Sequence, residues 1–335
     1  MRYPKFLNNK LYLIAPSFGC TTEPYKSRLE KAILNFKKEN IDVIRGENIT
    51  NTIGYRSASS ISCAKEFTKA YENNNFIMSV GGGNLMYEIL DDIDFNYIKA
   101  LPPTYFIGYS DNTNLSFLIT TLCDTASIYG YNAPEFGSNA LEESQIDQIN
   151  LMKGKKLLFK GYDKFELNSV KNETNPYANY NLDTKKELLI VNTKNVDIKG
   201  RLIGGCLDCL TPFVGTCYDK VADFNEKYKA DGIIWFLESC DLDAASLKVA
   251  LLQLKRAGWF KYLKGFLIGR PYMYNTDFLG LTMNQSVIDC LKDFNVPIII
   301  NADFGHLKPA LPIICGALSH IKASGNDLQI EYILK

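Results

Sequence analysis

The sequence predicts an α/β protein in which a mostly parallel sheet forms the core of the N-terminal part. Short apolar segments alternate with segments of helical periodicity between residues 11 and 122, which is typical of parallel strands joined by right-handed crossovers. Glycine or capping residues follow several of the apolar segments, as expected where strands end. The length of 335 residues exceeds the usual size of one core, so we expect two domains.

The N-terminal elements follow one another in a regular order. We expect strands at residues 11–15, 41–44, 76–80 and 105–107, each rich in apolar side chains. We expect helices at residues 25–40, 59–74 and 112–122, and the start of another at 85–90. In the first helix the apolar side chains fall on one face, at Leu29, Ala32, Ile33 and Phe36.

The composition changes after residue 137, where polar and turn-forming residues become frequent. We interpret residues 138–196 as a connector, and a long loop near a site often shapes specificity. The C-terminal part again contains apolar segments, with strands expected at 232–237, 265–269 and 296–300 and a helix at 243–257. The predicted organisation is an N-terminal domain of residues 1–137, the connector, and a C-terminal domain of residues 197–335.

Charge and composition favour a cytoplasmic protein. Lys and Arg together number 37, as do Asp and Glu, so no basic field is available for nucleic acid or an anionic membrane. No apolar run approaches the roughly 20 residues that span a bilayer. The N-terminus lacks the hydrophobic core and cleavage site of a signal peptide. The nine cysteines are therefore expected to be reduced thiols.

Cys206 and Cys209 have the C-x-x-C spacing that can indicate redox chemistry or half of a zinc site. No second pair of this kind exists in the sequence, and its two histidines, His306 and His320, lie far along the chain. We therefore expect neither a metal site nor a redox role for this pair.

Ser110 stands at a sharp change of pattern. The apolar segment 105–107 ends at Gly108, and a polar run that can start a helix begins at Asp111. A strand that turns directly into a helix exposes the side chain at the bend and aims free N–H groups at a bound group, which suits a serine nucleophile. The alternative is a connection in which Ser110 or Asp111 only caps the helix. Asn112 occupies the position of the second glycine in the usual Gly-x-Ser-x-Gly elbow.

A glycine run, Gly81-Gly82-Gly83-Asn84, follows the apolar segment that ends at Val80. Such a loop lets backbone N–H groups approach an oxyanion or a phosphate. It matches neither G-x-G-x-x-G nor the P-loop, and a plain tight turn is the structural alternative.

Two further polar residues lie at the ends of apolar segments in the C-terminal part. His306 follows the segment 296–300 in a glycine-flanked loop, whereas His320 lies in an alternating, strand-like stretch. Glu238 ends the strand predicted at 232–237 and is the natural acid to orient a histidine base, although alone it is more typical of a charge at a helix N-terminus.

These motifs resemble the serine peptidases of the LD-carboxypeptidase type, family S66, including the microcin C immunity branch. The resemblance covers nearly the whole chain and depends on five motifs: the glycine turn after Ser79-Val80, Ile107 to Thr113, Gly200 to Leu207, Phe236 to Glu238, and Ala302 to His306 with Leu311-Pro312-Ile313. It implies a flavodoxin-like N-terminal domain and a smaller C-terminal domain of mixed β/α structure, with the active site at the interdomain cleft, usually in a homodimer.

The resemblance also implies residue roles. Ser110 would be the nucleophile, His306 the general base and Glu238 its orienting partner, and the amides of Gly82 and Asp111 would form the oxyanion hole. No metal or cofactor is implied.

The family's substrates differ between its branches. The carboxypeptidases remove the terminal D-alanine from cytoplasmic murein tetrapeptides, and the immunity branch hydrolyses aminoacyl-nucleotide compounds of the microcin C type. The long connector and residues 187–192 look closer to the immunity branch. That branch stacks tryptophans on the nucleobase in this region, whereas the tryptophans here are Trp235 and Trp259.

We list four substrate-binding candidates: Gly83, Asn84, Tyr177 and Tyr180. The tyrosines would replace the missing stacking tryptophans. The predicted function is a serine hydrolase that cleaves an amide bond of a small peptide-like substrate through an acyl-enzyme. The hypotheses from other classes are a non-catalytic phosphate- or nucleotide-binding protein that uses the glycine loop, and a pseudoenzyme.

Overall fold

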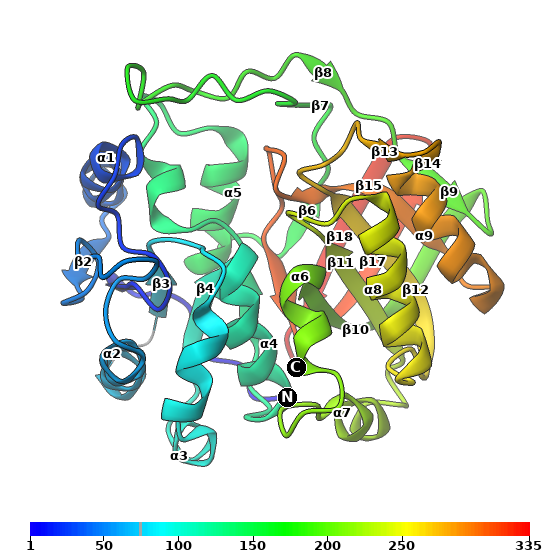
Figure 1. Cartoon of the computed structure of the whole chain (residues 1–335), viewed down its shortest axis with the longest axis horizontal. Helices are drawn as coiled ribbons and strands as arrows, with labels where there is room; N and C mark the ends of the chain where they lie inside the picture. Colours follow the sequence, from blue (N-terminus) through cyan, green and yellow to red (C-terminus); the bar gives the residue numbers. More distant parts are fainter. Residues whose placement is uncertain (74–75) are drawn as a thin grey trace. The chain divides into compact units, whose positions relative to one another are not determined.

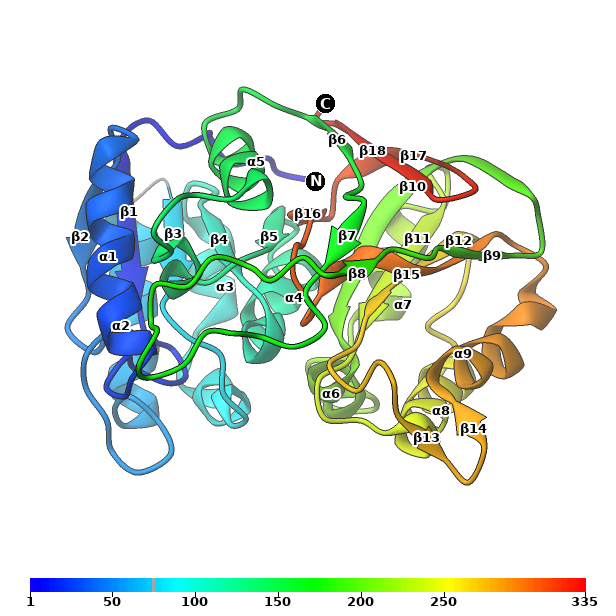
Figure 2. The same cartoon turned by 90° about the horizontal axis from the view of Figure 1, so that it is seen from above.

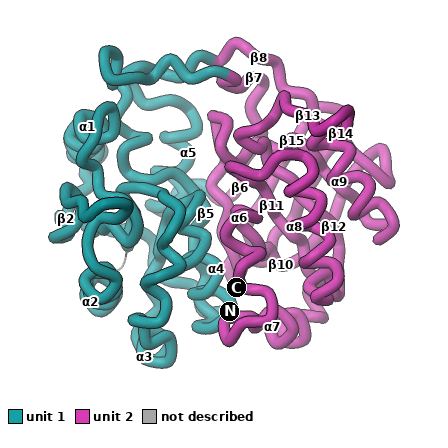
Figure 3. The backbone as a smooth tube through the Cα atoms, viewed as in Figure 1, with its two compact units in different colours: residues 1–156, 168–181 teal, residues 157–167, 182–335 magenta. Residues whose placement is uncertain are grey.

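The computed structural model describes residues 1–73 and 76–335 and divides the chain into two compact units (Figure 3). Unit 1 comprises Met1–Lys156 and Asn168–Asn181, and unit 2 comprises Leu157–Leu167 and Leu182–Lys335. The segment expected as a connector, 138–196, is thus shared between the units. The reason is that its apolar side chains are buried, among them Leu151 and Phe165.

Unit 1 has a parallel sheet with the strand order β5-β4-β3-β1-β2, and β1 to β4 match the four strands expected from the apolar segments (Figure 1). The strands are β1 (Lys10–Ile14), β2 (Asp42–Arg45), β3 (Phe76–Ser79), β4 (Tyr105–Gly108) and β5 (Ser127–Tyr129). The helices are α1 (Tyr25–Lys38), α2 (Ser60–Asn73), α3 (Phe95–Ala100), α4 (Thr113–Thr121) and α5 (Glu143–Met152). Short 3-10 helices are η1 (Met86–Asp92), η2 (Ser110–Asn112) and η3 (Ala133–Phe136). The predicted α/β class is confirmed.

Unit 1 differs from the expected elements in several places. Strand β5 and helix α5 were not expected, and α5 lies in the segment interpreted as a connector. The helix expected to start at 85–90 is the 3-10 helix η1, and the short helix α3, capped by the side chain of Asp94, was not expected. The helix expected at 112–122 is preceded by η2, so the turn after β4 is tighter than a direct entry into α4. The expected end of the second helix at residue 74 lies outside the described residues.

The strand order places a topological switch point between β1 and β3. The chain runs from β1 to β2 on one side and then returns to β3, β4 and β5 on the other side. In open parallel sheets a ligand binds where the loops after two such strands diverge. The loops that follow β1, β3 and β4 carry Ser17, the glycine run and Ser110. Strand β2 forms one edge of this sheet, and α1 runs beside it (Figure 2).

Unit 2 has a mixed sheet with the order β6-β18-β17-β10-β11-β12-β15-β9, in which β10, β11, β12 and β15 pair in parallel and the others antiparallel. Its strands are β6 (Leu158–Lys160), β9 (Leu189–Val191), β10 (Asn195–Cys206), β11 (Ile233–Glu238), β12 (Leu263–Arg270), β15 (Ile298–Gly305), β17 (Leu318–Ser324) and β18 (Asp327–Ile333). Shorter strands are β7 (Lys164–Phe165), β8 (Thr184–Lys185), β13 (Asp277–Phe278), β14 (Leu281–Thr282) and β16 (Ile313–Cys315).

The helices of unit 2 are α6 (Leu207–Leu210), α7 (Val221–Lys227), α8 (Ala244–Arg256) and α9 (Met283–Leu291), with 3-10 helices η4 (Thr211–Phe213) and η5 (Lys292–Phe294). Helices α8 and α9 pack side by side (Figure 1). The central strands β11 and β15 are buried at every position, as expected for parallel strands covered on both faces, whereas the hairpin β17–β18 alternates between buried and open positions. In residues 1–73 and 76–335 no helix has both the length and the apolar composition needed to cross a bilayer.

Candidate active site

Ser110 occupies a strained turn between β4 and α4 in unit 1. Its φ is +63°, a left-handed conformation that is costly for residues other than glycine, and such strain is concentrated at functional sites. Its amide donates a hydrogen bond to the hydroxyl of Tyr129 at 3.2 Å. Neither Ser110 nor Asp111 caps α4 with its side chain, because the N-cap residue is Asn112 and no side-chain cap bond is made there. The structure therefore does not support the capping alternative.

The glycine loop after β3 packs directly against Ser110. A Cβ built at Gly82 would lie 3.2 Å from both Cβ and Oγ of Ser110, which is closer than most Cβ contacts, so a side chain at Gly82 would crowd the serine. The carbonyl of Gly82 accepts a hydrogen bond from the amide of Phe18 at 3.1 Å. The side-chain amide of Asn112 donates to the carbonyl of Gly81 at 2.8 Å. The loop is thus fixed beside the serine from two sides.

Asp111 ties three loops of unit 1 together through its buried carboxylate. Its Oδ2 accepts the hydroxyl of Ser17 at 2.6 Å and the amide of Met86 at 2.9 Å, and its Oδ1 accepts the side-chain amide of Asn114 at 3.0 Å. Burial raises the pKa of Asp111, and these hydrogen bonds offset part of the rise because they stabilise the ionised form. The side chain of Asp111 therefore has a structural role, while its amide remains the group proposed for the oxyanion.

Glu238 and His306 meet in unit 2. Nδ1 of His306 lies 2.6 Å from Oε2 of Glu238, whose side chain is fully buried at the end of β11. A carboxylate accepts at this nitrogen only from an Nδ1–H, so it fixes the tautomer in which Nε2 carries the lone pair. Gly305, with φ +107°, leaves room for this contact, because a Cβ there would lie 3.1 Å from Oε2 of Glu238. A histidine held in this way by a carboxylate has the geometry that a base and its orienting group need.

The predicted site residues divide between the two units. Unit 1 contains Ser110, Asp111 and the loop with Gly82, Gly83 and Asn84. Unit 2 contains Glu238 and His306, which the structure brings together. The other histidine, His320, lies on β17 and pairs with Asp197 on a more open part of the sheet.

The two tyrosine candidates differ in their surroundings. The ring of Tyr177 is 36% exposed and has the Lys31 ammonium 5.8 Å from its centroid. The hydroxyl of Tyr180 accepts a hydrogen bond from Gln145, its ring contacts Tyr131, and burial raises its pKa well above the usual value. Tyr177 is therefore the one with an open face.

Neither tryptophan offers an exposed face. Trp235 and Trp259 stack on each other with 5.6 Å between ring centroids, and both are buried.

The cysteine pair lies beside Glu238, because Cys206 pairs with Glu238 across β10 and β11. The thiol of Cys206 donates to the carboxylate of Asp208 at 3.2 Å, and burial raises its pKa well above the usual value. A raised pKa disfavours the thiolate that redox chemistry and metal ligation need.

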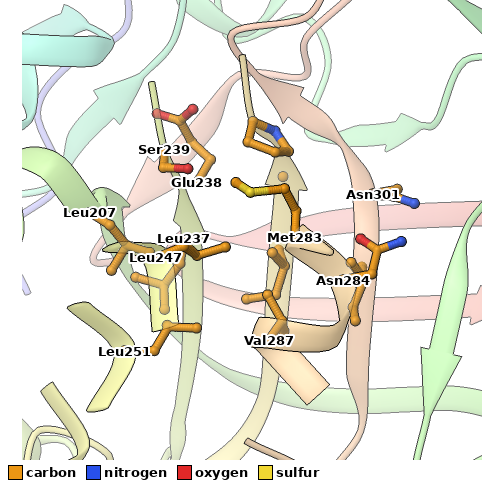
Figure 4. A pocket seen from close by; sticks show the side chains of 14 residues that line it. Leu207, Leu237, Glu238, Ser239, Leu247, Leu251, Met283, Asn284, Val287 and Asn301 are labelled. Carbon is orange, nitrogen blue, oxygen red and sulfur yellow. The ribbon is translucent and has the colours of Figure 1, made fainter. Parts of the chain in front are cut away.

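Figure 4 shows a small cavity next to Glu238 and Ser239, lined mostly by apolar side chains of the sheet, α8 and α9. Its volume is about 20 Å³, which is enough for a water molecule and too little for a peptide-like substrate. This cavity is therefore a gap in the packing and not a substrate site.

The sequence analysis missed several residues that shape the site: Ser17, Phe18 and Tyr129. Phe18 lies in the loop after β1, and 41% of its surface is exposed. A Cβ at Gly83 would lie 3.3 Å from the Phe18 ring, so this ring borders the glycine loop. The available signal was the run Pro16-Ser17-Phe18-Gly19 directly after a buried strand, a position where parallel sheets carry binding residues.

Family comparison agrees with the two-part organisation. The model of the LD-carboxypeptidase N-terminal domain matches residues 11–130, and that of the LD-carboxypeptidase C-terminal domain matches residues 199–321. A Vibrio cholerae protein whose name describes it as a carboxypeptidase is 23% identical over 341 aligned positions, covering 99% of this chain and 98% of its own length.

Two solved structures share the fold over nearly the full length. An MccF-like protein from Bacillus anthracis superposes with a TM-score of 0.84 at 20% identity, covering 99% of this chain and 100% of that one. The microcin C7 self-immunity protein MccF, in complex with aspartyl sulfamoyl adenosine, gives a TM-score of 0.78 at 21% identity, covering 99% and 98%. At these identities the likeness establishes the fold alone.

Proposed function

The chain belongs to the LD-carboxypeptidase family, peptidase family S66, and from this premise we propose that it is a serine hydrolase that cleaves an amide bond of a small peptide-like substrate. The observation that carries the proposal is the 2.6 Å contact between Nδ1 of His306 and the buried carboxylate of Glu238. Further support comes from the strained backbone of Ser110 and the close approach of Gly82.

In this proposal Ser110 Oγ attacks the scissile carbonyl while Nε2 of His306 takes its proton. The tetrahedral oxyanion accepts hydrogen bonds from the amides of Gly82 and Asp111. The proton then passes from Nε2 to the leaving nitrogen, the C–N bond breaks, and an acyl ester on Ser110 remains. A water that His306 deprotonates hydrolyses this ester and restores the serine. Glu238 stays ionised and stabilises the imidazolium in both halves.

The mechanism requires Ser110 of unit 1 to come within hydrogen-bond reach of His306 of unit 2 in the working enzyme. Because side chains and backbone amides perform every step, activity is expected to survive treatment with a chelator. We also propose that the protein acts in the cytoplasm and that it forms a homodimer. Light scattering after size-exclusion chromatography would measure the mass of the assembly.

Two substrate classes fit the proposal. The first is a murein tetrapeptide that loses its terminal D-alanine, as the name of the family suggests. The second is an aminoacyl-nucleotide, and the observation that favours it is a pair of exposed aromatic rings in unit 1, Phe18 and Tyr177, which could stack on a base. The MccF structure with aspartyl sulfamoyl adenosine shows that a protein of this fold binds such a compound.

The test combines active-site labelling with product analysis. A fluorophosphonate should label Ser110 of the wild type, and mass spectrometry should detect products from a murein tetrapeptide or an aminoacyl-sulfamoyl adenosine incubated in parallel. Ser110→Ala should abolish labelling and turnover, and Glu238→Gln should lower turnover by orders of magnitude at unchanged fold. Nucleotide affinity without labelling or turnover would instead indicate the binding-protein alternative.

A further inference from the structure

A buried ion cluster lies directly behind the loop that carries His306. Asp303 of β15 is completely buried, and its Oδ1 accepts Nη1 of Arg270 at 2.7 Å while its Oδ2 accepts Nζ of Lys186 at 3.0 Å. Arg270 is 1% exposed and Lys186 is 4% exposed. Two cations share one carboxylate here, and charges this deep are retained only where they are paired and hydrogen-bonded.

Arg270 also holds the chain on both sides of His306. Its carbonyl accepts the amide of His306 at 3.3 Å. Its Nη2 donates to the carbonyl of Leu307 at 3.3 Å and to that of Pro309 at 2.5 Å. The guanidinium thus makes its hydrogen bonds to Asp303, three residues before the histidine, and to carbonyls one and three residues after it. A planar group with several fixed donors is suited to this task.

Other bonds close the same loop but do not replace Arg270. The amide of Leu311 donates to the carbonyl of Asp303 at 2.6 Å, and the amide of Glu166 donates to the carbonyl of Lys308 at 2.7 Å. The first contact joins the base of the loop, and the second holds Lys308 in its middle. The carbonyls on either side of Lys308, those of Leu307 and Pro309, are held by the guanidinium.

Residues of the segment expected as a connector complete the cluster. A Cβ at Gly161 would lie 2.2 Å from Oδ2 of Asp303 and 2.7 Å from Nζ of Lys186, so only glycine fits there. The ring of Phe165 lies 4.9 Å from the Arg270 guanidinium, within the range of a cation–π contact. Phe165 and Lys186 stand on either side of the segment Asn168–Asn181, which belongs to unit 1 and carries Tyr177.

We propose that Arg270 is a positioning residue for the catalytic base: through Asp303 and the carbonyls of Leu307 and Pro309 it fixes the loop that aims His306 at Glu238 and at the serine. Lys186, which follows the segment Asn168–Asn181 in the sequence, binds the second carboxylate oxygen of Asp303. Phe165, which precedes that segment, contacts Arg270. The residues that flank the segment are thus joined to the same cluster. The inference rests on the proposed hydrolase function. A merely structural cluster would affect stability without a separate effect on the chemical step.

The chain offers a matched control for Arg270. Arg201 is also a buried arginine of unit 2, with an ion pair to Asp231 and a hydrogen bond of 2.7 Å to the carbonyl of Gly316. Both Asp231 and Gly316 lie outside the loop of residues 303–311. Arg270→Lys and Arg201→Lys therefore remove the same planar group and keep the charge, at two places that differ in their relation to His306.

The experiment measures kcat, KM, the rate of fluorophosphonate labelling and the free energy of unfolding for both variants. Arg270→Lys is expected to lower kcat and the labelling rate at least about tenfold with little change in KM, because a small displacement of a catalytic group has a large effect on the chemical step. Arg201→Lys should keep kcat within about twofold even where its stability falls. Gly161→Ala places a methyl group against Asp303 without removing a charge, so it should lower kcat by a smaller factor than Arg270→Lys does.

Equal kcat values for the two lysine variants, or losses of activity that only follow losses of stability, would overturn the inference. Proton NMR separates this result from a failure of the proposed function. The low-field Nδ1–H resonance of His306 should be present in the wild type and in Arg201→Lys and broadened or lost in Arg270→Lys, whether or not a substrate is turned over. If the wild type is not labelled at Ser110, the hydrolase proposal fails while this readout still tests the positioning role.

Discussion

The amide of Ser110 donates its hydrogen bond to the hydroxyl of Tyr129, with 3.2 Å between nitrogen and oxygen. The serine's own N–H is therefore engaged within unit 1. This leaves the neighbouring amide of Asp111 and that of Gly82 as the donors for the proposed oxyanion, and it makes Tyr129 a support for the strained turn.

Replacing Tyr129 by Phe should weaken this support. The partly buried amide of Ser110 would lose its acceptor, which costs about 1 kcal/mol, and the turn should relax away from its strained conformation. We expect a lower free energy of unfolding in urea and a kcat reduced several-fold.

Tyr105→Phe is the matched control, because Tyr105 is a buried tyrosine of the same sheet. Among the residues that the structure describes, its hydroxyl has no hydrogen-bond partner. Removing that hydroxyl should leave stability unchanged or raise it, with unchanged kcat. Equal losses in the two variants would contradict the role given to Tyr129.

The strain at Ser110 predicts that glycine is the most stable residue at this position. Ser110→Gly and Ser110→Ala both lack the hydroxyl, so they differ only in the cost of the positive φ. The glycine variant should be about 1 kcal/mol more stable in urea unfolding.

Ser116, buried within α4, provides the opposite case. There the glycine variant should be less stable than the alanine variant by roughly 0.5–1 kcal/mol, as in any helix interior. The same order of stability at both positions would show that the backbone of Ser110 is not strained.

Asp111 should give the native state a measurable pH dependence. Burial raises the pKa of its carboxyl above the ordinary 3.8, so the folded protein keeps this proton to higher pH than the unfolded chain. The stability that this retained proton gives the folded state is fully present below pH 3.8, and it is lost as the pH rises through the pKa of the folded state.

Asp111→Asn isolates this effect. The wild-type free energy of unfolding minus that of the variant should decrease from acid to neutral pH, as urea titrations across that range would measure. Taking the difference removes the contributions of all other groups. A difference that is constant with pH, or that increases, would contradict the raised pKa.

Phe18 should contribute to substrate binding and not to the chemical step. Its exposed ring borders the glycine loop, so Phe18→Ala should raise KM several-fold for an aminoacyl-nucleotide with kcat nearly unchanged. Tyr177→Ala tests the second exposed ring in the same way.

Tyr97→Ala is the control for both, because Tyr97 is an exposed aromatic residue of unit 1 bonded to Glu72 in the last turn of α2. That turn precedes β3, so Tyr97 lies at the amino ends of the strands, away from Ser110. An equal KM rise in all three variants would rule out a specific role for Phe18.

The sequence was sufficient for the α/β class, for strands β1 to β4 of unit 1 and for the meeting of Glu238 with His306. These depend on local patterns: apolar segments form strands, and polar residues directly after parallel strands converge at one edge. The support of the site was not predictable in this way. Tyr129 reaches Ser110, and Arg270 reaches Pro309, through bonds that depend on where distant segments lie after folding.

The segment 138–196 differs from the expected connector for a related reason. Its polar residues and turns resemble a loop, but isolated side chains such as Phe165 and Lys186 are buried against residues far along the chain. A periodicity search does not detect single anchors of this kind. The short 3-10 helix η1 was also beyond such a search, because it is held by long-range contacts and not by a helical repeat.

The division of the chain has a consequence for synthesis on the ribosome. Arg28 of α1 is completely buried, and its guanidinium donates to carbonyls of Pro134 and Glu135 and also to those of Pro176 and Ala178. The last two lie in the segment that returns to unit 1 after the first strand of unit 2 has been made. The N-terminal half therefore lacks two of the acceptors of Arg28 while it emerges alone, and a gene fragment that stops at residue 156 should yield a chain in which Nη1 of this buried guanidinium has lost the carbonyls of Pro176 and Ala178.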